Sequence, residues 1–233
     1  MNYNYELKVF PTIEDVCSTA ANIFSDLLNT NGKNIFIVPG GSTPQIFYNF
    51  LAQSINDWKD TTLLLSDERL VHEDFFESNF GMIKRNLLDL IQNGDSPKLI
   101  SVLNKFLPEQ SSQILKSLNI LIRPLHPIKA AFLGVGADGH TASIFPGIEE
   151  DGYNEQPFFL VNKKNEEFQR ISISSTILSE IPLLIFLVAG KGKKKVLSQI
   201  INVSSDVSLL PIHHVMKKAK DKVLILCDRN AAP

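Results

Sequence analysis

A histidine in a glycine-rich turn is the strongest candidate for chemistry in this sequence. The apolar run Ala130–Leu133 is followed by Gly-Val-Gly-Ala-Asp-Gly-His at 134–140 and then by small residues suited to opening a helix. A turn of this kind after a strand lies at the carboxyl edge of a parallel sheet, where open α/β folds bind their ligands. The unperturbed pKa of histidine suits it to act as a base or an acid near neutral pH. His140 is therefore a candidate catalytic base; the alternative is a tight turn in which the histidine only hydrogen-bonds its neighbours.

A second strand-to-helix turn has the composition of an anion site. The apolar run Ile35–Val38 ends in Pro-Gly-Gly-Ser-Thr-Pro at 39–44, and a helical repeat of apolar residues follows. Glycines let backbone N–H groups approach an anion, hydroxyls add donors, and a helix N-terminus adds a favourable dipole. The turn is neither a Walker A loop nor a dinucleotide fingerprint. The residues predicted to bind a phosphate are Gly40, Gly41, Ser42 and Thr43. Either hydroxyl could instead simply cap the helix.

Charged side chains follow two other predicted strands. Thr62–Leu65 leads into Ser-Asp-Glu-Arg at 66–69, where two acids and an arginine are placed to hold a ligand. The fork of donors on Arg69 suits a phosphate or a carboxylate. Leu183–Ala189 leads into a glycine-spaced run of lysines at 191–195, which opposes the helix dipole unless an anion compensates it. The plainer explanations are a surface ion pair and a solvated helix start.

Composition limits the classes of protein to which this chain belongs. The chain has 233 residues, 44% of them hydrophobic, so it can bury a core without a disulfide or a metal. The net charge of -2 gives no field that would attract a nucleic acid. Cys17 and Cys227 lie at opposite ends with no disulfide or metal-ligand spacing, which suits a reducing compartment. The longest apolar run, Ile181–Ala189, is too short for a bilayer span of about 20 residues. We therefore expect a cytoplasmic protein with no membrane or nucleic-acid partner.

Predicted strands and helices alternate along the whole chain. This order predicts an α/β fold, with residues 1–233 forming a single domain around a doubly wound, mostly parallel, Rossmann-like sheet with helices on both faces. The ligand site would lie at the carboxyl ends of the strands. Residues 149–164 are polar and irregular and are predicted to form a loop or hairpin over that site. His213 and His214 are predicted to lie in a loop and, without a spaced partner, not to bind a metal.

Several sequence blocks, taken in order along the chain, resemble those of the 6-phosphogluconolactonase family over nearly the whole length. The matching blocks are Gly-Gly-Ser-Thr-Pro at 40–44, Asp-Glu-Arg at 67–69, Ser-Asn at 78–79, the histidine turn extended to 147, Arg-Ile-Ser at 170–172, Gly190 with Lys193, and Asp228 with Ala-Ala at 231–232. The related glucosamine-6-phosphate deaminases share the fold, the phosphate loop and a Gly-x-Asp-Gly-His turn. They differ in having an Asn-Glu-Pro-like segment after the histidine and a tyrosine at the position of Arg69, so both differences favour the lactonases.

The resemblance implies hydrolysis of 6-phospho-D-glucono-1,5-lactone to 6-phosphogluconate, with His140 as the general base that activates water. Asp138 would orient His140 or only shape the turn. Backbone N–H groups around 134–136 or at Gly41 are candidates for stabilising the oxyanion. No cofactor or metal is implied. The partner would be a small-molecule sugar-phosphate lactone, and the protein a monomer or weak homo-oligomer.

By the same resemblance, Arg69 and Lys193 bind the substrate phosphate together with the hydroxyls at 42–43. The run of lysines leaves the phosphate lysine ambiguous by one or two positions. Arg170 is also a site candidate, and the alternative for it is a surface charge at a strand edge. Two alternatives stay open: a deaminase-type isomerase, which needs Asp67 to act on a substrate carbon, and a catalytically silent sugar-phosphate-binding module.

Overall fold

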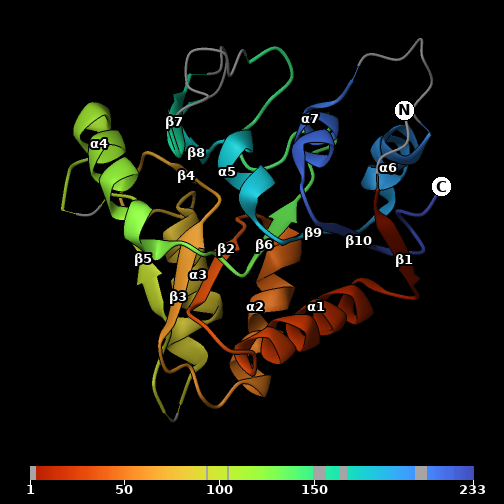
Figure 1. Cartoon of the computed structure of the whole chain (residues 1–233), viewed down its shortest axis with the longest axis horizontal. Coiled ribbons are helices and arrows are strands. Elements are labelled where there is room, and N and C mark those ends of the chain that lie inside the picture. The colour runs from red at the N-terminus through yellow and green to blue at the C-terminus, as the bar shows by residue number, and fades with distance from the viewer. Residues whose placement is uncertain (1–3, 93, 104, 149–155, 163–166, 203–208) are drawn as a thin grey trace.

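A parallel sheet forms the centre of the computed structural model, which describes residues 4–92, 94–103, 105–148, 156–162, 167–202 and 209–233. Its strands are β1 (Glu6–Phe10), β2 (Asn34–Val38), β3 (Thr61–Leu65), β5 (Lys98–Ile100), β6 (Ala130–Gly134), β9 (Leu183–Val188) and β10 (Lys222–Asp228). They lie in the order β1-β10-β9-β6-β2-β3-β5, and all six neighbouring pairs are parallel. β1 and β5 are therefore the two edges of the sheet (Figure 1).

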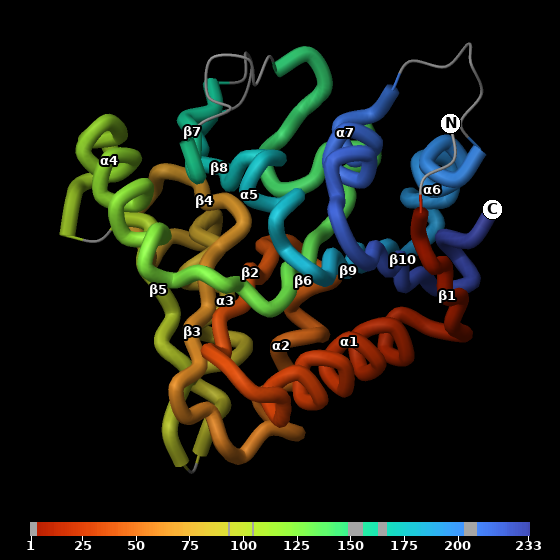
Figure 2. Tube along the Cα trace, in the orientation of Figure 1, coloured from red at the N-terminus to blue at the C-terminus, as the bar shows by residue number. Residues whose placement is uncertain are grey.

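Helices cover both faces of this sheet (Figures 1 and 2). The helices of one face are α1 (Ile13–Leu28), α2 (Ser42–Ser54) and α3 (Asn79–Asn86). Those of the other face are α4 (Ser111–Leu121), α5 (Ser175–Glu180), α6 (Lys194–Ile201) and α7 (Pro211–Lys218). Short 3-10 turns occupy Leu88–Leu90 (η1), Arg123–Leu125 (η2) and Lys191–Lys193 (η4). The predicted doubly wound α/β fold is confirmed.

Several helices begin at side chains that cap them. Thr12 and Asp15 form a capping box at the start of α1, in which each side chain accepts a hydrogen bond from the other residue's backbone N–H. Ser78 accepts from the N–H of Gly81 at the start of α3, and Ser174 caps α5 in the same way. Such caps contribute about 1 kcal/mol each and fix where the chain leaves a loop.

Aromatic side chains fill the layer between the sheet and helices α1 and α2. Phe24 of α1 packs on Phe36 of β2 with ring centroids 4.2 Å apart, and Phe47 of α2 stacks on Phe132 of β6 at 5.0 Å. All are fully buried, and burial of each such side chain contributes about 1.5–3 kcal/mol. This packing anchors β2 and β6 side by side.

The order of the strands reverses between β2 and β6. From β2 the chain proceeds outward to β3 and β5, whereas from β6 it proceeds the other way to β9 and β10. A crevice opens at such a switch point because the connections leave in opposite directions. The two glycine-rich turns follow β2 and β6 directly, so the topology places them at this crevice.

A small antiparallel sheet, which the sequence does not predict, lies above the carboxyl edge of the main one. Its strands are β4 (Asp67–Arg69), β8 (Arg170–Ile173) and β7 (Phe158–Val161), in that order. Ser66 joins the two sheets, because its N–H donates to the carbonyl of Val38 and its own carbonyl accepts from Ile173. For the predicted loop or hairpin at 149–164, the described part agrees with a hairpin, because β7 pairs antiparallel with the next strand, β8. Residues 149–155 and 163–164 lie outside the described part.

The paired histidines lie in a helix, and the prediction of a loop there is wrong. Pro211 opens α7 at its first position, where a missing N–H costs nothing. His213 is buried, and its Nδ1 accepts from the N–H of Leu210 while Nε2 lies 3.2 Å from the carbonyl oxygen of Ile200. Burial lowers the pKa of His213, so it packs as a neutral ring.

The two cysteines lie in the hydrophobic core. Cys17 and Cys227 are free and buried, and burial raises the pKa of their thiols to about 12 and about 11. Within the described residues, no group of three or more His, Cys, Asp and Glu side chains is arranged to hold a metal ion. None of the helices described above combines the length and hydropathy needed to cross a membrane.

Candidate active site

A pocket of about 290 Å³ lies at the switch point between the turns that follow β2 and β6. It gathers all the predicted site residues except Asp138, namely Gly40, Gly41, Ser42, Thr43, Arg69, His140, Arg170 and Lys193. Asp138 lies behind His140 and contacts it. Residues separated by more than 150 positions in the sequence thus share one cavity, as expected for the carboxyl ends of neighbouring parallel strands.

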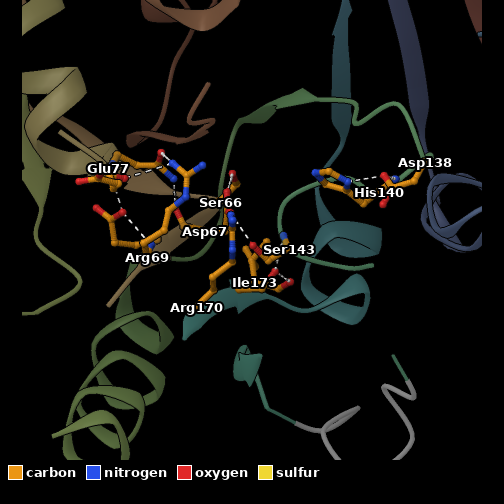
Figure 3. Close-up of polar contacts among 12 residues, drawn as sticks. Ser66, Asp67, Arg69, Glu77, Asp138, His140, Ser143, Arg170 and Ile173 are labelled. Atoms are coloured by element: carbon orange, nitrogen blue, oxygen red, sulfur yellow. Dashed lines mark hydrogen bonds and ion pairs between the residues drawn. The ribbon is translucent and has the colours of Figure 1, made fainter. Parts of the chain in front are cut away.

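His140 and Asp138 form a pair within the turn after β6 (Figure 3). The carboxylate of Asp138 contacts ring Nδ1 of His140 and also accepts the backbone N–H of His140 at 3.2 Å. Asp138 therefore both shapes the turn and orients the ring. Partial burial raises the pKa of Asp138, but the hydrogen bonds and charge of His140 outweigh it, and the pKa lies below its usual value. An ionised Asp138 keeps the proton on Nδ1, which makes Nε2 the basic nitrogen.

Gly136 provides the space in which the imidazole lies. A Cβ at this position would overlap the ring of His140 and crowd the carboxylate of Asp138. The N–H of Gly136 donates to the carbonyl of His140 at 2.8 Å, which closes the turn. This N–H is therefore engaged, and it leaves the set of candidate oxyanion donors.

An aromatic side chain lies against the imidazole, and an arginine lies over that aromatic ring. The ring of Phe145 lies 4.5 Å from that of His140 between centroids, and the guanidinium carbon of Arg170 lies 5.6 Å from the centroid of Phe145. A cation at this distance from a ring face is attracted to it. Arg170 from β8 lines the same pocket as His140, with only 15% of its side chain exposed.

Asp67 connects the small sheet to the histidine turn. Its carboxylate accepts from the hydroxyl of Ser143 at 2.6 Å and from that of Ser66 at 3.1 Å, and it lies 4.0 Å from Nη1 of Arg170. Figure 3 shows Ser143 and Arg170 between the Arg69 group on one side and His140 on the other. Asp67 lines the pocket with its carboxylate already engaged by protein donors.

The other acid of the motif faces away from the pocket, which corrects the prediction that both acids hold a ligand. Glu68 is 2% exposed and accepts from the backbone N–H groups of Arg69, Asn79 and Phe80 and from the hydroxyl of Ser78. Burial raises the pKa of Glu68 to about 7, against the lowering effect of the backbone hydrogen bonds. Side chains alternate between the two faces of a strand, so Glu68 points opposite to its neighbours in β4.

The start of α2 is open to an anion. Its N-cap is Gly41, at φ 106°, a conformation that favours glycine, and no side chain caps the helix. The alternative that Ser42 or Thr43 caps α2 is therefore wrong. The buried hydroxyl of Tyr48 donates to the carbonyl of Pro39 at 2.6 Å and fixes the turn. Uncapped N–H groups and the helix dipole both favour a negative group here.

Lys193 is the lysine of its run that reaches the pocket. It is half-buried, whereas the lysines at 191, 194 and 195 are exposed. The turn before it is fixed by Asp228, whose carboxylate accepts the N–H of Gly190 at 3.0 Å. Burial lowers the pKa of Lys193, while the negative charge of Asp138 acts in the opposite direction. A partly desolvated ammonium beside an anion site gains more from a bound phosphate than an exposed one does.

Asn79 also lines the pocket, although the sequence does not predict it as a site residue. Its Oδ1 accepts from Nη1 of Arg69 at 2.7 Å, and Arg69 also donates to the carbonyl of Glu77 at 3.2 Å. The available signal was the Ser-Asn pair at 78–79, which predicts a helix start but not a contact with Arg69.

Known proteins resemble this chain over almost its whole length. A 6-phosphogluconolactonase of Caulobacter vibrioides is 28% identical over 232 residues, covering 95% of this chain and 96% of the relative. The crystal structure of a 6-phosphogluconolactonase from Shewanella baltica is 26% identical, with a TM-score of 0.81 over 97% of this chain and 98% of that one. A monomeric glucosamine-6-phosphate deaminase has a TM-score of 0.80 at 18% identity, covering 97% and 98%, which shows a shared fold alone. A family model described as glucosamine-6-phosphate isomerases/6-phosphogluconolactonase matches residues 11–225, and the chain belongs to this family.

Proposed function

We propose that this protein hydrolyses 6-phospho-D-glucono-1,5-lactone to 6-phosphogluconate. The observation that carries the proposal is a single pocket in which an oriented imidazole, His140 with Asp138, faces an uncapped helix start with Arg69 and Lys193. A lactone ring that carries a phosphate presents the two groups that such a pocket can address. Relatives that cover most of the chain are named 6-phosphogluconolactonase.

In the proposed reaction, Nε2 of His140 removes a proton from a water molecule as the water oxygen attacks the lactone carbonyl carbon. Negative charge then develops on the carbonyl oxygen, where backbone N–H groups or Arg170 can stabilise it. As the intermediate collapses, the bond from the carbonyl carbon to the ring oxygen breaks, and the imidazolium returns its proton to that oxygen. The products are a carboxylic acid and a free hydroxyl on one chain, so the step consumes one water and needs no redox partner.

The phosphate would lie across the N-terminus of α2, with charge from Arg69 and Lys193. These groups contact the same atoms in the ground state and in the transition state, so they contribute to binding more than to the rate of the chemical step. We further expect the protein to act in the cytoplasm, because its two buried free thiols suit a reducing compartment. We expect it to be a monomer or a weak homo-oligomer.

The geometry of Asp67 disfavours the deaminase-type alternative. That reaction requires a carboxylate able to act on a substrate carbon, whereas Asp67 already accepts hydrogen bonds from Ser66 and Ser143 and is only 8% exposed. A silent binding module is also disfavoured, because binding a sugar phosphate requires no carboxylate-oriented imidazole.

The deciding experiment is a coupled assay of lactone hydrolysis. The lactone is generated in place, 6-phosphogluconate dehydrogenase reports the product, and the spontaneous rate is subtracted. We expect turnover well above the spontaneous rate and no ammonia from glucosamine 6-phosphate. Ammonia release without lactone turnover would support the deaminase instead. If neither reaction occurs although 6-phosphogluconate binds, the chain is a binding module.

Lys193→Ala is expected to raise KM for the phosphorylated lactone about tenfold to hundredfold while changing kcat less, since a hydrogen bond to a charged group contributes about 1.5–3 kcal/mol. Steady-state kinetics on the wild type and the variant provide the measurement. Lys195→Ala is the matched control, because Lys195 is exposed in the same run and lies outside the pocket lining. An equal rise in KM for both variants would contradict a specific contact at Lys193.

A further inference from the structure

Asn79 contacts both parts of the anion end of the pocket, which consists of Arg69 and the turn at Gly40 that precedes α2. It is the first residue of α3 and is 2% exposed. Its Oδ1 accepts from Nη1 of Arg69 at 2.7 Å, and its Nδ2 donates to the carbonyl of Asp67 at 2.8 Å. Each polar atom of this amide thus has a partner in β4. The side chain cannot turn over without losing both hydrogen bonds, because the donor and the acceptor would exchange places.

The same amide packs on the turn that precedes α2. A Cβ on Gly40 would overlap the side-chain amide of Asn79, so the backbone of that turn lies directly against Asn79. Only glycine leaves room for this contact. The amide therefore lies between the arginine of β4 and the helix start that follows β2.

Asn79 is itself held rigidly. Its backbone N–H donates to the carboxylate of Glu68 at 2.8 Å, and the same carboxylate accepts from the N–H groups of Arg69 and Phe80. A long side chain such as arginine loses rotamer freedom when it binds a ligand, and a hydrogen bond that fixes it beforehand reduces that loss. A rigid neighbour can also set the spacing between two groups that must meet one anion.

We propose that Asn79 is the positioning residue for anion recognition, holding the Arg69 guanidinium and the turn at Gly40 so that both meet one phosphate group. The proposal deepens the function proposed above, because that phosphate would be the one on the substrate lactone. Asn79 itself contacts no reacting atom. Its effect is expected on affinity and on the preference for a phosphorylated substrate.

The test measures the binding of inorganic phosphate to the full-length protein by calorimetry, alongside lactone kinetics. Asn79→Ala is expected to weaken phosphate binding about tenfold or more, the usual size of a lost contact to a charged group. KM for the phosphorylated lactone should rise by a similar factor with a smaller change in kcat. The preference for the phosphorylated lactone over unphosphorylated glucono-1,5-lactone, measured as a ratio of kcat/KM values, should fall about tenfold. Unchanged phosphate affinity would overturn the proposal.

A double-mutant cycle separates positioning from a general structural effect. Because part of the effect of Asn79 passes through Arg69, Asn79→Ala should weaken phosphate binding clearly less on the Arg69→Ala background than in the wild type. Additive losses would overturn the proposal. Asn79→Ser is made in parallel, in case the alanine variant does not fold, because its side chain is polar but too short to reach Arg69.

Ser78→Ala is the matched control for the start of α3. Loss of this N-cap should lower Tm while phosphate affinity stays within about twofold of the wild type. If Ser78→Ala weakened phosphate binding as much as Asn79→Ala, the effect would belong to the helix start, and the proposal would be wrong. Phosphate binding is measured without turnover, so the proposal can hold even if lactone hydrolysis is not detected.

Discussion

The His140→Ala variant is expected to lose about 10² to 10⁴ in kcat for lactone hydrolysis, the contribution of a positioned general base. The ring nitrogen opposite to Asp138 is the group that accepts the proton of water, and alanine leaves no base in its place. The imidazole is 30% exposed, so its removal should change stability little. The coupled assay with the spontaneous rate subtracted gives kcat, and thermal unfolding confirms that the variant is folded.

His214→Ala provides the matched control, because His214 is exposed on α7. It should hydrolyse lactone at the wild-type rate. Phosphate binding by His140→Ala should also stay near the wild-type value, since the anion end is built by other residues. A His140 variant with nearly normal turnover would rule out the proposed mechanism.

Gly136→Ala is expected to lower kcat about 100-fold, because a displacement of about 1 Å at a catalytic group can cost this much. The new methyl group would overlap the imidazole and crowd Asp138, so the ring must leave its place. The same variant made on a His140→Ala background should lose little more, since no imidazole remains to be displaced. Steady-state kinetics of the two single variants and the double variant provide the measurement.

Gly192→Ala is the matched glycine control. A Cβ at position 192 would meet no atom within 4 Å, and the residue does not have a positive φ. Its kcat should equal that of the wild type. If Gly136→Ala retained full activity, the position of the ring would not limit the rate, and the assigned role of Gly136 would be wrong.

Local sequence signals were sufficient for the parts of the fold that are local. The apolar strands β2 and β6 each end in a glycine-rich turn, and the rule that parallel strands place such turns at one edge predicts their meeting. The pocket contains the predicted residues of both turns for this reason. Only the structure shows that Lys193 is the lysine of its run that reaches the pocket, because the direction of each lysine depends on the bend at Gly190.

Contacts between distant segments could not be predicted from composition. β7 is four residues long and is defined by its pairing with β8, so its surroundings in the sequence look irregular. Asn79 lies 39 positions after Gly40, and nothing in either segment indicates that they touch. Neighbouring residues of a strand face opposite sides, so a strand at Asp67–Arg69 would have indicated that Glu68 faces away from the pocket, but no sequence pattern marks these three residues as a strand.

Two glycines leave space for functional side chains, and this space restricts how sequences of this family can diverge. Gly40 leaves room for the amide at position 79, and Gly136 leaves room for the imidazole at position 140. Each pair occupies a volume that holds only one side chain. A relative with a larger residue at position 40 must therefore carry a different residue at position 79, and the same holds for 136 and 140. Substitutions within each pair should be correlated among homologues, while the two pairs vary independently of each other.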